Sequence, residues 1–274
     1  MSGTIERVVV PLDAASESHA AIDTAARLAA RAKAPLHGVF VEDEDLLHLA
    51  SLPFARQSTL GAAAEKLTRE HIELHLKTAA ERARKDLLAA AKRHGVAATF
   101  EVVRGPSGTA LAGASQRDLV VAGALTRPIG AHFRLECRWL SSLEVSPGPI
   151  LLVRHAWSAN GSVVMLLRNQ DASAARLLET AAHLAQAADR LLTVICPPAV
   201  AGRAGFEKWI AERLAGSAVR LQVEVAPAEP AALRERIGAL GCRLLAIEAG
   251  GTDGDGEQLR EFVEYFACDI LTVR

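Results

Sequence analysis

Short apolar runs alternate with longer helical patterns along the first half of the chain. Val8, Val9 and Val10 form a continuous run of β-branched residues, which is typical of a strand covered on both faces of a parallel sheet. Between such runs, apolar residues recur every three or four positions, the spacing of an amphipathic helix. The pattern predicts strands at 7–12, 36–41, 99–104, 119–122 and 150–153, helices at 16–33 and about 62–94, and a short helix after Gly105 and Pro106.

The same order recurs in the second half, after a loop-forming segment at 155–161. The predicted strands are 162–167, 191–196, 219–225, 244–248 and 270–273, and the predicted helices are 174–188, 205–214, 230–240 and 257–266. The run GPILLVR ends at Arg154 and CDILTVR ends at Arg274, a spacing of 120 residues (274 minus 154). We interpret this as a duplication, with one domain at 1–155 and a shorter, divergent domain at 162–274.

Composition and charge narrow the class of protein. Half of the residues are hydrophobic and only 4% are aromatic, so we expect cores built from Ala, Leu and Val. The 31 basic and 32 acidic residues give a net charge of -1, which provides no broad positive field for nucleic acid or an anionic membrane. The start of the chain lacks the pattern of a leader, and no apolar run is long enough to span a bilayer. We therefore expect a cytoplasmic protein that binds neither nucleic acid nor membrane.

Three motifs carry a family resemblance. The run VVVPLD ends at Asp13 and precedes an Ala-rich helix, DLVVAG ends at Gly123, and PILLVR ends at Arg154. This ordered set resembles universal stress proteins, and the second half repeats it more weakly. The resemblance implies an α/β fold of two open parallel five-stranded sheets, each flavodoxin-like or Rossmann-like with strand order 3-2-1-4-5 and helices on both faces. Because the last strand of each sheet is an apolar edge, we expect the strands at 150–153 and 270–273 to pair antiparallel in a pseudo-dimer.

The resemblance also indicates where a nucleotide would bind. Nucleotide-binding members of the family hold the adenosine near the residue equivalent to Asp13 and cradle phosphates with a G-2x-G-9x-G-[S/T] loop. Counted from Gly123, the other defining positions hold Thr126, Glu136 and Cys137, so one of the four residues is kept. We expect Glu136 to open a helix beside the phosphates and to repel them.

The second half departs further from that pattern, and we expect its site to be lost. Arg168 stands at the aspartate position, and Ala249 stands at the first glycine position. The segment from Ala249 to Cys268 is also six residues shorter than its counterpart from Gly123 to Gly148, at 19 against 25 positions.

These observations leave two functional hypotheses. We favour a non-catalytic stress protein with a regulatory or interaction role, degenerate nucleotide sites, no cofactor and no catalytic residue, acting on an unidentified signalling partner and compatible with a homodimer. The alternative is an adenine-nucleotide-binding protein, or a slow ATPase, that binds ATP with magnesium in a remodelled loop around Arg127, Arg134 and Arg138. The candidate nucleotide-binding residues are Asp13, Val41, Gly123, Thr126, Arg127, Glu136 and Cys137.

Three histidines, a glycine-rich run and a serine are further candidate sites. His71 and His75 share one helix face, with His48 as a conceivable third ligand, but the spacing lacks a metal motif, and we expect exposed or interface histidines and no metal. The acidic run GGTDGDG at 250–256 favours a solvated loop over a phosphate site. A hydrolase triad of Ser107, Asp118 and His132 lacks a nucleophile elbow and is not expected.

The four cysteines and an insertion at 41–57 complete the picture. Cys137, Cys196, Cys242 and Cys268 form no CxxC pair. Cys242 and Cys268 precede neighbouring strands in the expected order and can approach each other, although we expect reduced thiols in the cytoplasm. The insertion carries five large apolar residues, which we expect to be buried against the other half or another chain. They are Leu46, Leu47, Leu49, Leu52 and Phe54.

Overall fold

The structure of the chain is a computed structural model. This structure describes residues 5–14, 19–50, 56–57, 65–66, 68–111, 113–123, 125–129, 132–136, 146–154, 161–226, 229–248 and 268–273. The expected helix at 257–266 and the start of the helix expected at 16–33 lie outside these ranges.

The first half forms parallel strands in the order β5-β2-β1-β6-β9. These strands are β1 (Arg7–Leu12), β2 (Leu36–Asp43), β5 (Ala98–Gly105), β6 (Asp118–Gly123) and β9 (Ile150–Val153). The second half repeats the order as β12-β11-β10-β13-β14. Its strands are β10 (Ser162–Leu166), β11 (Leu191–Cys196), β12 (Arg220–Val225), β13 (Cys242–Glu248) and β14 (Asp269–Val273).

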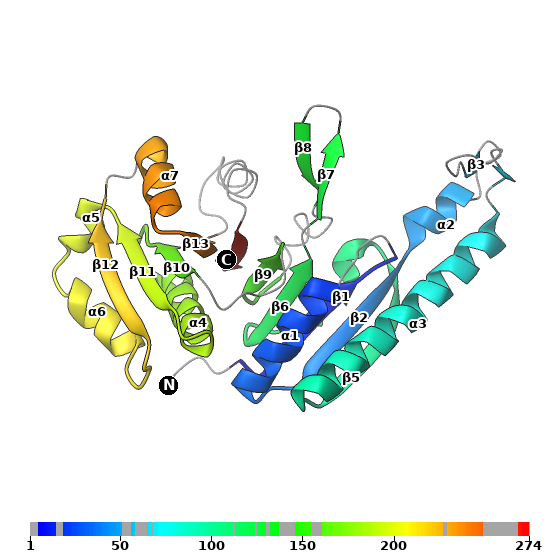
Figure 1. The fold of residues 1–274 in the computed structure, drawn as a ribbon, viewed down its shortest axis with the longest axis horizontal. Helices are drawn as coiled ribbons and strands as arrows, with labels where there is room; N and C mark the ends of the chain where they lie inside the picture. The colour runs from blue at the N-terminus through cyan, green and yellow to red at the C-terminus, as the bar shows by residue number, and fades with distance from the viewer. Residues whose placement is uncertain are drawn as a thin grey trace.

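The two sets of strands form one sheet, so the expectation of two separate five-stranded sheets is corrected. Strands β9 and β14 pair antiparallel, with Leu151 opposite Leu271, and join all ten strands (Figure 1). The antiparallel pairing of these strands was expected from the sequence, and the register confirms it. Both strands are short and fully buried, so each satisfies the backbone groups of an apolar edge that would otherwise be exposed.

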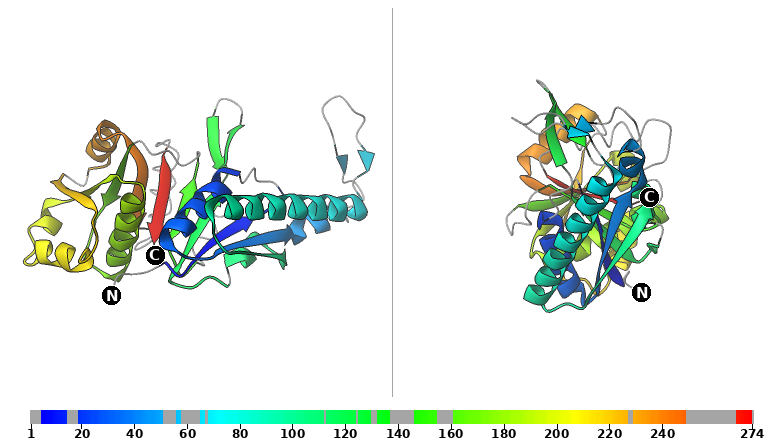
Figure 2. Two further views of the ribbon diagram at one scale, coloured as in Figure 1. Left: turned by 60° about the horizontal axis from the view of Figure 1, so that its bottom comes forward. Right: turned by 90° about the vertical axis from the view of Figure 1, so that its right-hand side faces the viewer.

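Helices cover both faces of the sheet. On one face, a single hydrophobic core runs through both halves under α1 (His19–Ala32), α3 (Arg69–His94), α4 (Ala172–Ala187) and α6 (Phe206–Arg213). On the other face, a second core lies under the 3-10 helix η1 (Ser107–Leu111) and α7 (Pro230–Ala239). A short helix, α5 (Pro198–Ala201), follows β11. The long α3 lies along the first-half strands in Figure 2.

Small residues allow the helices to lie close to the strands. Gly38 of β2 faces α3, and a Cβ there would come within 2.8 Å of a Leu87 methyl group. The buried face of α1 is built mainly from alanines, as the sequence pattern predicted. The end of α3 is also as expected, because Gly95 adopts the left-handed conformation that closes a helix, with φ 68°.

The segment before α3 differs from the expectation. The long helix begins at Arg69 and not near residue 62, and the side chain of Thr68 caps it by accepting a hydrogen bond from the His71 N–H. Two short strands, β3 (Arg56–Gln57) and β4 (Glu65–Lys66), pair where helix or loop was expected. Helix propensity is a weak preference, and local strand pairing overrides it here.

The insertion contains a helix, α2 (Glu44–Ala50), that the sequence pattern did not predict. Leu47 is buried against Ile72 and Leu76 of α3, and Leu46 packs on the same cluster. These two leucines are therefore covered by their own half and not by the other half. The side chains of Leu49, Leu52 and Phe54 lie outside the described residues.

Candidate functional site

The candidate site lies where the chain direction across the sheet reverses. Strands β1 and β6 are parallel neighbours, and their connections run to opposite sides of the sheet. Asp13 directly follows β1, and Gly123 is the last residue of β6, so the structure brings both to the carboxyl edge. This is the position at which open α/β sheets bind ligands.

Gly123 leaves ordinary space around the end of β6. A Cβ at this position would meet only the Cβ of Ala21, at 3.8 Å, which is a normal van der Waals distance. A ligand could therefore approach the backbone from that side, and packing does not require a glycine at this position. This geometry is compatible with a ligand at the edge but does not demand one.

Val41 contributes its side chain to the core. It lies in β2 opposite Val103 of β5, and it is fully buried in the cluster on the η1 face. A ligand at this position could therefore meet only its backbone. Val41 lies near the carboxyl end of β2, and its side chain is a packing element.

An antiparallel ribbon stands where the sequence predicted a phosphate loop followed by a helix. It consists of β7 (Leu125–Ile129) and β8 (His132–Glu136) and projects beyond the carboxyl end of β6 (Figure 1). Thr126 pairs with Leu135, and Glu136 pairs with Leu125 at the base of the ribbon. Glu136 therefore ends a strand and does not open a helix. Because Glu136 pairs with Leu125, which is two residues after Gly123, the ribbon brings Glu136 back to the end of β6. Cys137 lies outside the described residues.

Two basic residues occupy one rung of this ribbon. Arg127 of β7 is opposite Arg134 of β8. The sequence is compatible with this ribbon, because short runs that can form strands lie on both sides of Gly130 and Ala131. The second-half position equivalent to Asp13 is Arg168, which follows β10, whereas Ala249 lies outside the described residues.

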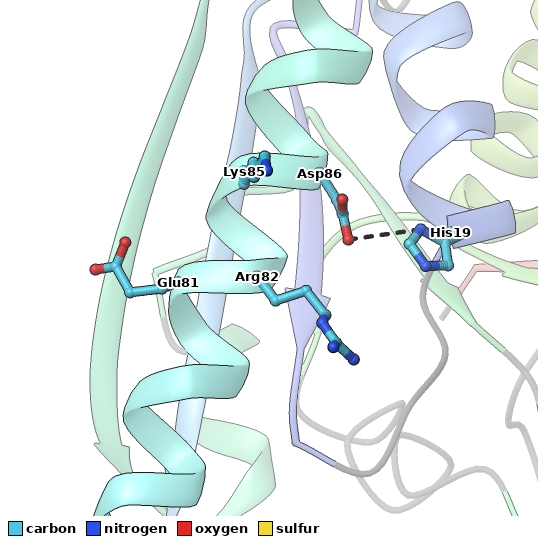
Figure 3. A pocket seen from close by; sticks show the side chains of 5 residues that line it. All are labelled: His19, Glu81, Arg82, Lys85 and Asp86. Carbon is cyan, nitrogen blue, oxygen red and sulfur yellow. Dashed lines mark ion pairs between the residues drawn. The ribbon is translucent and has the colours of Figure 1, made fainter.

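A surface hollow flanks the start of α1 (Figure 3). It has a volume of about 570 Å³ and is lined by His19 of α1 and by Glu81, Arg82, Lys85 and Asp86 of α3. His19 Nδ1 lies 3.6 Å from the Asp86 carboxylate, whereas Glu81 points away from it. The two acidic and two basic side chains balance, so the lining presents no net field for an anionic ligand.

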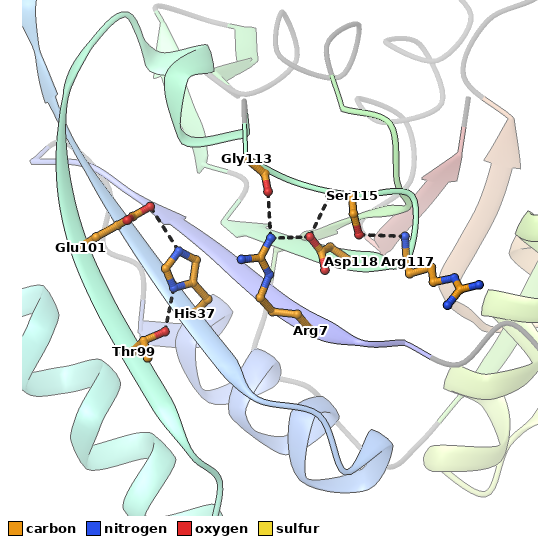
Figure 4. Close-up of polar contacts among 8 residues, drawn as sticks. All are labelled: Arg7, His37, Thr99, Glu101, Gly113, Ser115, Arg117 and Asp118. Atoms are coloured by element: carbon orange, nitrogen blue, oxygen red, sulfur yellow. Dashed lines mark hydrogen bonds and ion pairs between the residues drawn. The ribbon is translucent and has the colours of Figure 1, made fainter.

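The amino end of the sheet carries a polar cluster that the sequence analysis missed (Figure 4). Arg7 donates to the Asp118 carboxylate at 2.6 Å and to the Gly113 carbonyl at 2.8 Å, and the Ser115 N–H donates to the same carboxylate at 2.8 Å. The hydrogen bond to Asp118 raises the pKa of Arg7, so the guanidinium stays charged. The sequence signal that could have revealed this cluster is the presence of a charged residue at the start of each of two neighbouring strands.

This cluster is structural and occupies a residue of the rejected triad. Asp118 is buried and fixes the turn before β6, at the end of the sheet opposite Gly123. Its carboxylate is therefore engaged with Arg7.

A second polar group in Figure 4 fastens an edge strand. His37 of β2 hydrogen-bonds to Thr99 through Nδ1, at 2.8 Å, and to Glu101 through Nε2, at 3.2 Å. Thr99 and Glu101 are two residues apart in β5 and so lie on one face of the sheet. The ring thereby ties β5 to β2.

His48, His71 and His75 are exposed on helices α2 and α3. Within the described ranges, no group of three or more His, Cys, Asp or Glu side chains is arranged to hold a metal ion. None of the described helices has the length and apolar character needed to cross a membrane.

Comparison with known proteins finds a family match within the first half of the chain and a fold shared over nearly all of it. Residues 4–133 match the universal stress protein family. A universal stress protein from Archaeoglobus fulgidus is 11% identical, with a TM-score of 0.67, over 97% of this chain and 95% of that chain. A functionally unknown protein from Pseudomonas aeruginosa is 16% identical, with a TM-score of 0.62, over 99% of this chain and 93% of that chain. A search of curated proteins found no match.

The structural matches establish a shared fold. Support for the universal stress protein family comes from the match over residues 4–133. The mixed α/β sheet is shared with the solved structures across nearly the whole chain. The family match itself covers the segment that contains Asp13 and Gly123.

Proposed function

We propose that the chain is a tandem universal stress protein with a non-catalytic regulatory or interaction role in a stress response. The family match over residues 4–133 supports the first domain. The repeated strand order supports a second domain of the same type, and so does a universal stress protein that aligns over 95% of its own length. In this proposal the antiparallel contact of β9 and β14 is the centre of an intramolecular pseudo-dimer.

The observation that carries the non-catalytic role is the ribbon β7–β8. A phosphate loop presents backbone N–H groups that have no partner of their own, so that they can point at the anion. In the ribbon, residues 125–129 pair with residues 132–136, and the N–H groups that face the other strand are used in that pairing. The residues present therefore do not fit a triphosphate cradle.

The charge at the base of the ribbon acts in the same direction. Glu136 stands where the family motif has a glycine, and its backbone pairs with Leu125, two residues after Gly123. At ~5 Å and an effective dielectric constant of ~20, each unit-charge repulsion is about 3 kcal/mol, or roughly a hundredfold in affinity. Tight binding of ATP is not expected in either half, since Arg168 replaces the equivalent of Asp13 in the second.

The alternative is weak adenine-nucleotide binding with magnesium at the first-half edge. Two observations favour keeping it. Asp13 and Gly123 lie at the ends of neighbouring strands, and the space beside Gly123 is open to ordinary contact. Arg127 and Arg134 occupy one rung of the ribbon and offer positive charge for an anion.

Titration calorimetry with ATP and magnesium separates the two proposals. We expect no saturation at low micromolar ATP for the unaltered chain and measurable affinity for the triple variant Thr126→Gly, Glu136→Gly, Cys137→Ser. A matched control, Glu212→Gln, removes an exposed carboxylate from α6 and leaves the affinity unchanged. Nucleotide released by denaturing the purified protein, read near 260 nm, provides a second measurement.

Micromolar binding by the unaltered chain would overturn the nucleotide-free role and support the alternative. A triple variant that still fails to bind would mean that further parts of the site have been lost, which strengthens the non-catalytic role. A gain of affinity in the Glu212→Gln control would refute the assignment of repulsion to Glu136.

A further inference from the structure

Two cysteines lie at the amino ends of neighbouring strands in the second half. Cys242 is the first residue of β13, and Cys268 directly precedes β14. The strands are parallel, with Leu244 opposite Asp269, so the two cysteines are at the same end of the sheet. Cys268 is buried, Cys242 is partly buried, and neither forms a disulfide.

An irregularity in β13 brings the two side chains to one face. Side chains of a regular strand alternate, so Cys242 would share the face of Leu244. Consecutive residues of β10 pair with Cys242 and Leu244, however, which leaves Arg243 as an extra residue. Such a bulge redirects the side chain next to it. Cys242 accordingly packs against the core cluster that contains Cys268, whereas Leu244 lies in the other cluster.

The two thiols interact directly and are not equivalent. A hydrogen bond between them lowers the pKa of Cys268 and raises the pKa of Cys242. Burial opposes ionisation of both thiols. The negative charge of Asp269 also opposes the Cys268 thiolate, and the positive charge of Arg154 favours it. Cys268 is thus the sulfur on which negative charge is better stabilised, and Cys242 is the thiol that donates to it.

We propose that Cys242 and Cys268 form an oxidation site that peroxide closes to a disulfide. The Cys268 thiolate attacks one peroxide oxygen, the O–O bond breaks, and the other oxygen leaves as water after taking a proton. Cys242 then attacks the sulfur of the resulting sulfenic acid, the S–O bond breaks, and the second water leaves. Two thiols lose two electrons to one peroxide, and the products are one disulfide and two waters.

Cys196 provides a contrast within the same chain. It is buried on the other side of the sheet, where its Sγ lies 3.8 Å from the Glu224 carbonyl oxygen. Burial raises its pKa, which disfavours the reactive thiolate. Cys196 therefore serves as a matched control for a buried cysteine without a thiol neighbour among the described residues.

The disulfide would link β13 to β14, the strand through which the two halves of the sheet are joined. Strand β14 pairs with β13 on one side and with β9 of the first half on the other. A crosslink between residues 242 and 268 closes the connection between these strands and restricts the unfolded chain. Oxidation should therefore raise the melting temperature.

The test is thiol mapping of the full chain before and after treatment with hydrogen peroxide. After denaturation, alkylation and digestion, we expect a peptide pair linked through Cys242 and Cys268, two fewer alkylated thiols, and recovery of both by dithiothreitol. Cys196→Ser should retain the link and the rise in melting temperature. Cys242→Ser should lose both and should leave Cys268 as a sulfenic or sulfinic acid.

Other outcomes would overturn the proposal. They are full alkylation of both cysteines after peroxide, a link through Cys137 in place of this pair, or overoxidation of Cys268 in the unaltered chain. Cys242→Ala gives a second variant if the serine destabilises the fold. Peptide mapping of the unaltered protein also decides the question without any variant. Nucleotide binding does not enter this measurement, so its result is independent of the proposed function.

Discussion

Replacement of Gly148 by alanine tests how closely the chain approaches the turn before β6. A Cβ at residue 148 would lie 2.6 Å from the carbonyl oxygens of both Ser115 and Asp118. A carbon atom normally stays ~3.3 Å or more from such an oxygen. Both obstacles are backbone atoms, and the Asp118 carboxylate holds their turn through hydrogen bonds from Arg7 and the Ser115 N–H. Either this turn or the entry to β9 must shift.

We expect Gly148→Ala to lower the free energy of unfolding by about 3 kcal/mol, the upper part of the range for an overpacked site, because neither neighbour can rotate away. With a urea m-value of ~3 kcal/mol/M for a chain of this size, the midpoint of unfolding falls by about 1 M. The matched control is Gly113→Ala in the same turn, where a Cβ would meet nothing within 4 Å. Its midpoint should change little. Equal midpoints for the two variants would refute the close approach at residue 148.

Two further substitutions have definite expected outcomes. Burial alone raises the pKa of Asp23, but hydrogen bonds from His94, Arg93 and Arg27 lower it below its ordinary value. A lowered carboxylate pKa stabilises the fold above the unfolded pKa and loses this effect as pH falls through the folded pKa. The stability advantage over Asp23→Asn should therefore be constant at neutral pH and shrink as pH falls below about 5 in urea titrations, and an advantage that persists at the lowest pH would contradict it. Gly238 lies within α7 with open space at its Cβ position, so Gly238→Ala should raise the melting temperature, with a gain of about 0.4 to 1 kcal/mol, and a fall would contradict this reasoning.

Strand order was predictable because each buried strand is written as a continuous apolar run. The runs at β1, β6 and β9 contain almost no polar residue, and parallel strands with helical crossovers can be arranged in few ways. The pairing of β9 with β14 followed from the same property, since two apolar edges in one chain are best satisfied by each other. What the expectation missed is that this pairing makes one sheet of ten strands.

Segments outside the buried strands were harder to predict. The Ala-rich stretch at 62–66 has high helix propensity, yet β4 pairs there with β3, and α3 begins only after Thr68. Such preferences amount to tenths of a kcal/mol per residue, so one local pairing can outweigh them. The helix α2 was missed because its acidic first turn was interpreted as irregular, although Asp43 caps it by accepting a hydrogen bond from the Asp45 N–H.

The residues of the candidate site were likewise predictable where they follow buried strands and unpredictable where they lie in the following segment. Asp13 and Gly123 could be placed at one edge because their positions depend only on strand order. The positions of Thr126 and Glu136 depend on how the chain folds after β6, and counting along a family motif assumed a loop and a helix where the structure has a ribbon. A motif that has lost its glycines no longer specifies the loop that those glycines allowed.

The two halves differ at the amino ends of their last strands, β9 and β14, and the strand pairings show why. Val120 pairs with Ile150 in the first half and Leu245 pairs with Ile270 in the second, so Gly148 and Cys268 occupy equivalent positions. In the first half, the turn before β6 crosses this position so closely that a Cβ would collide with two carbonyl oxygens. In the second half, the bulge at the start of β13 changes the approach, and a cysteine side chain fits beside Cys242. The second half therefore holds a pair of cysteines at the position where the first half has a close backbone approach.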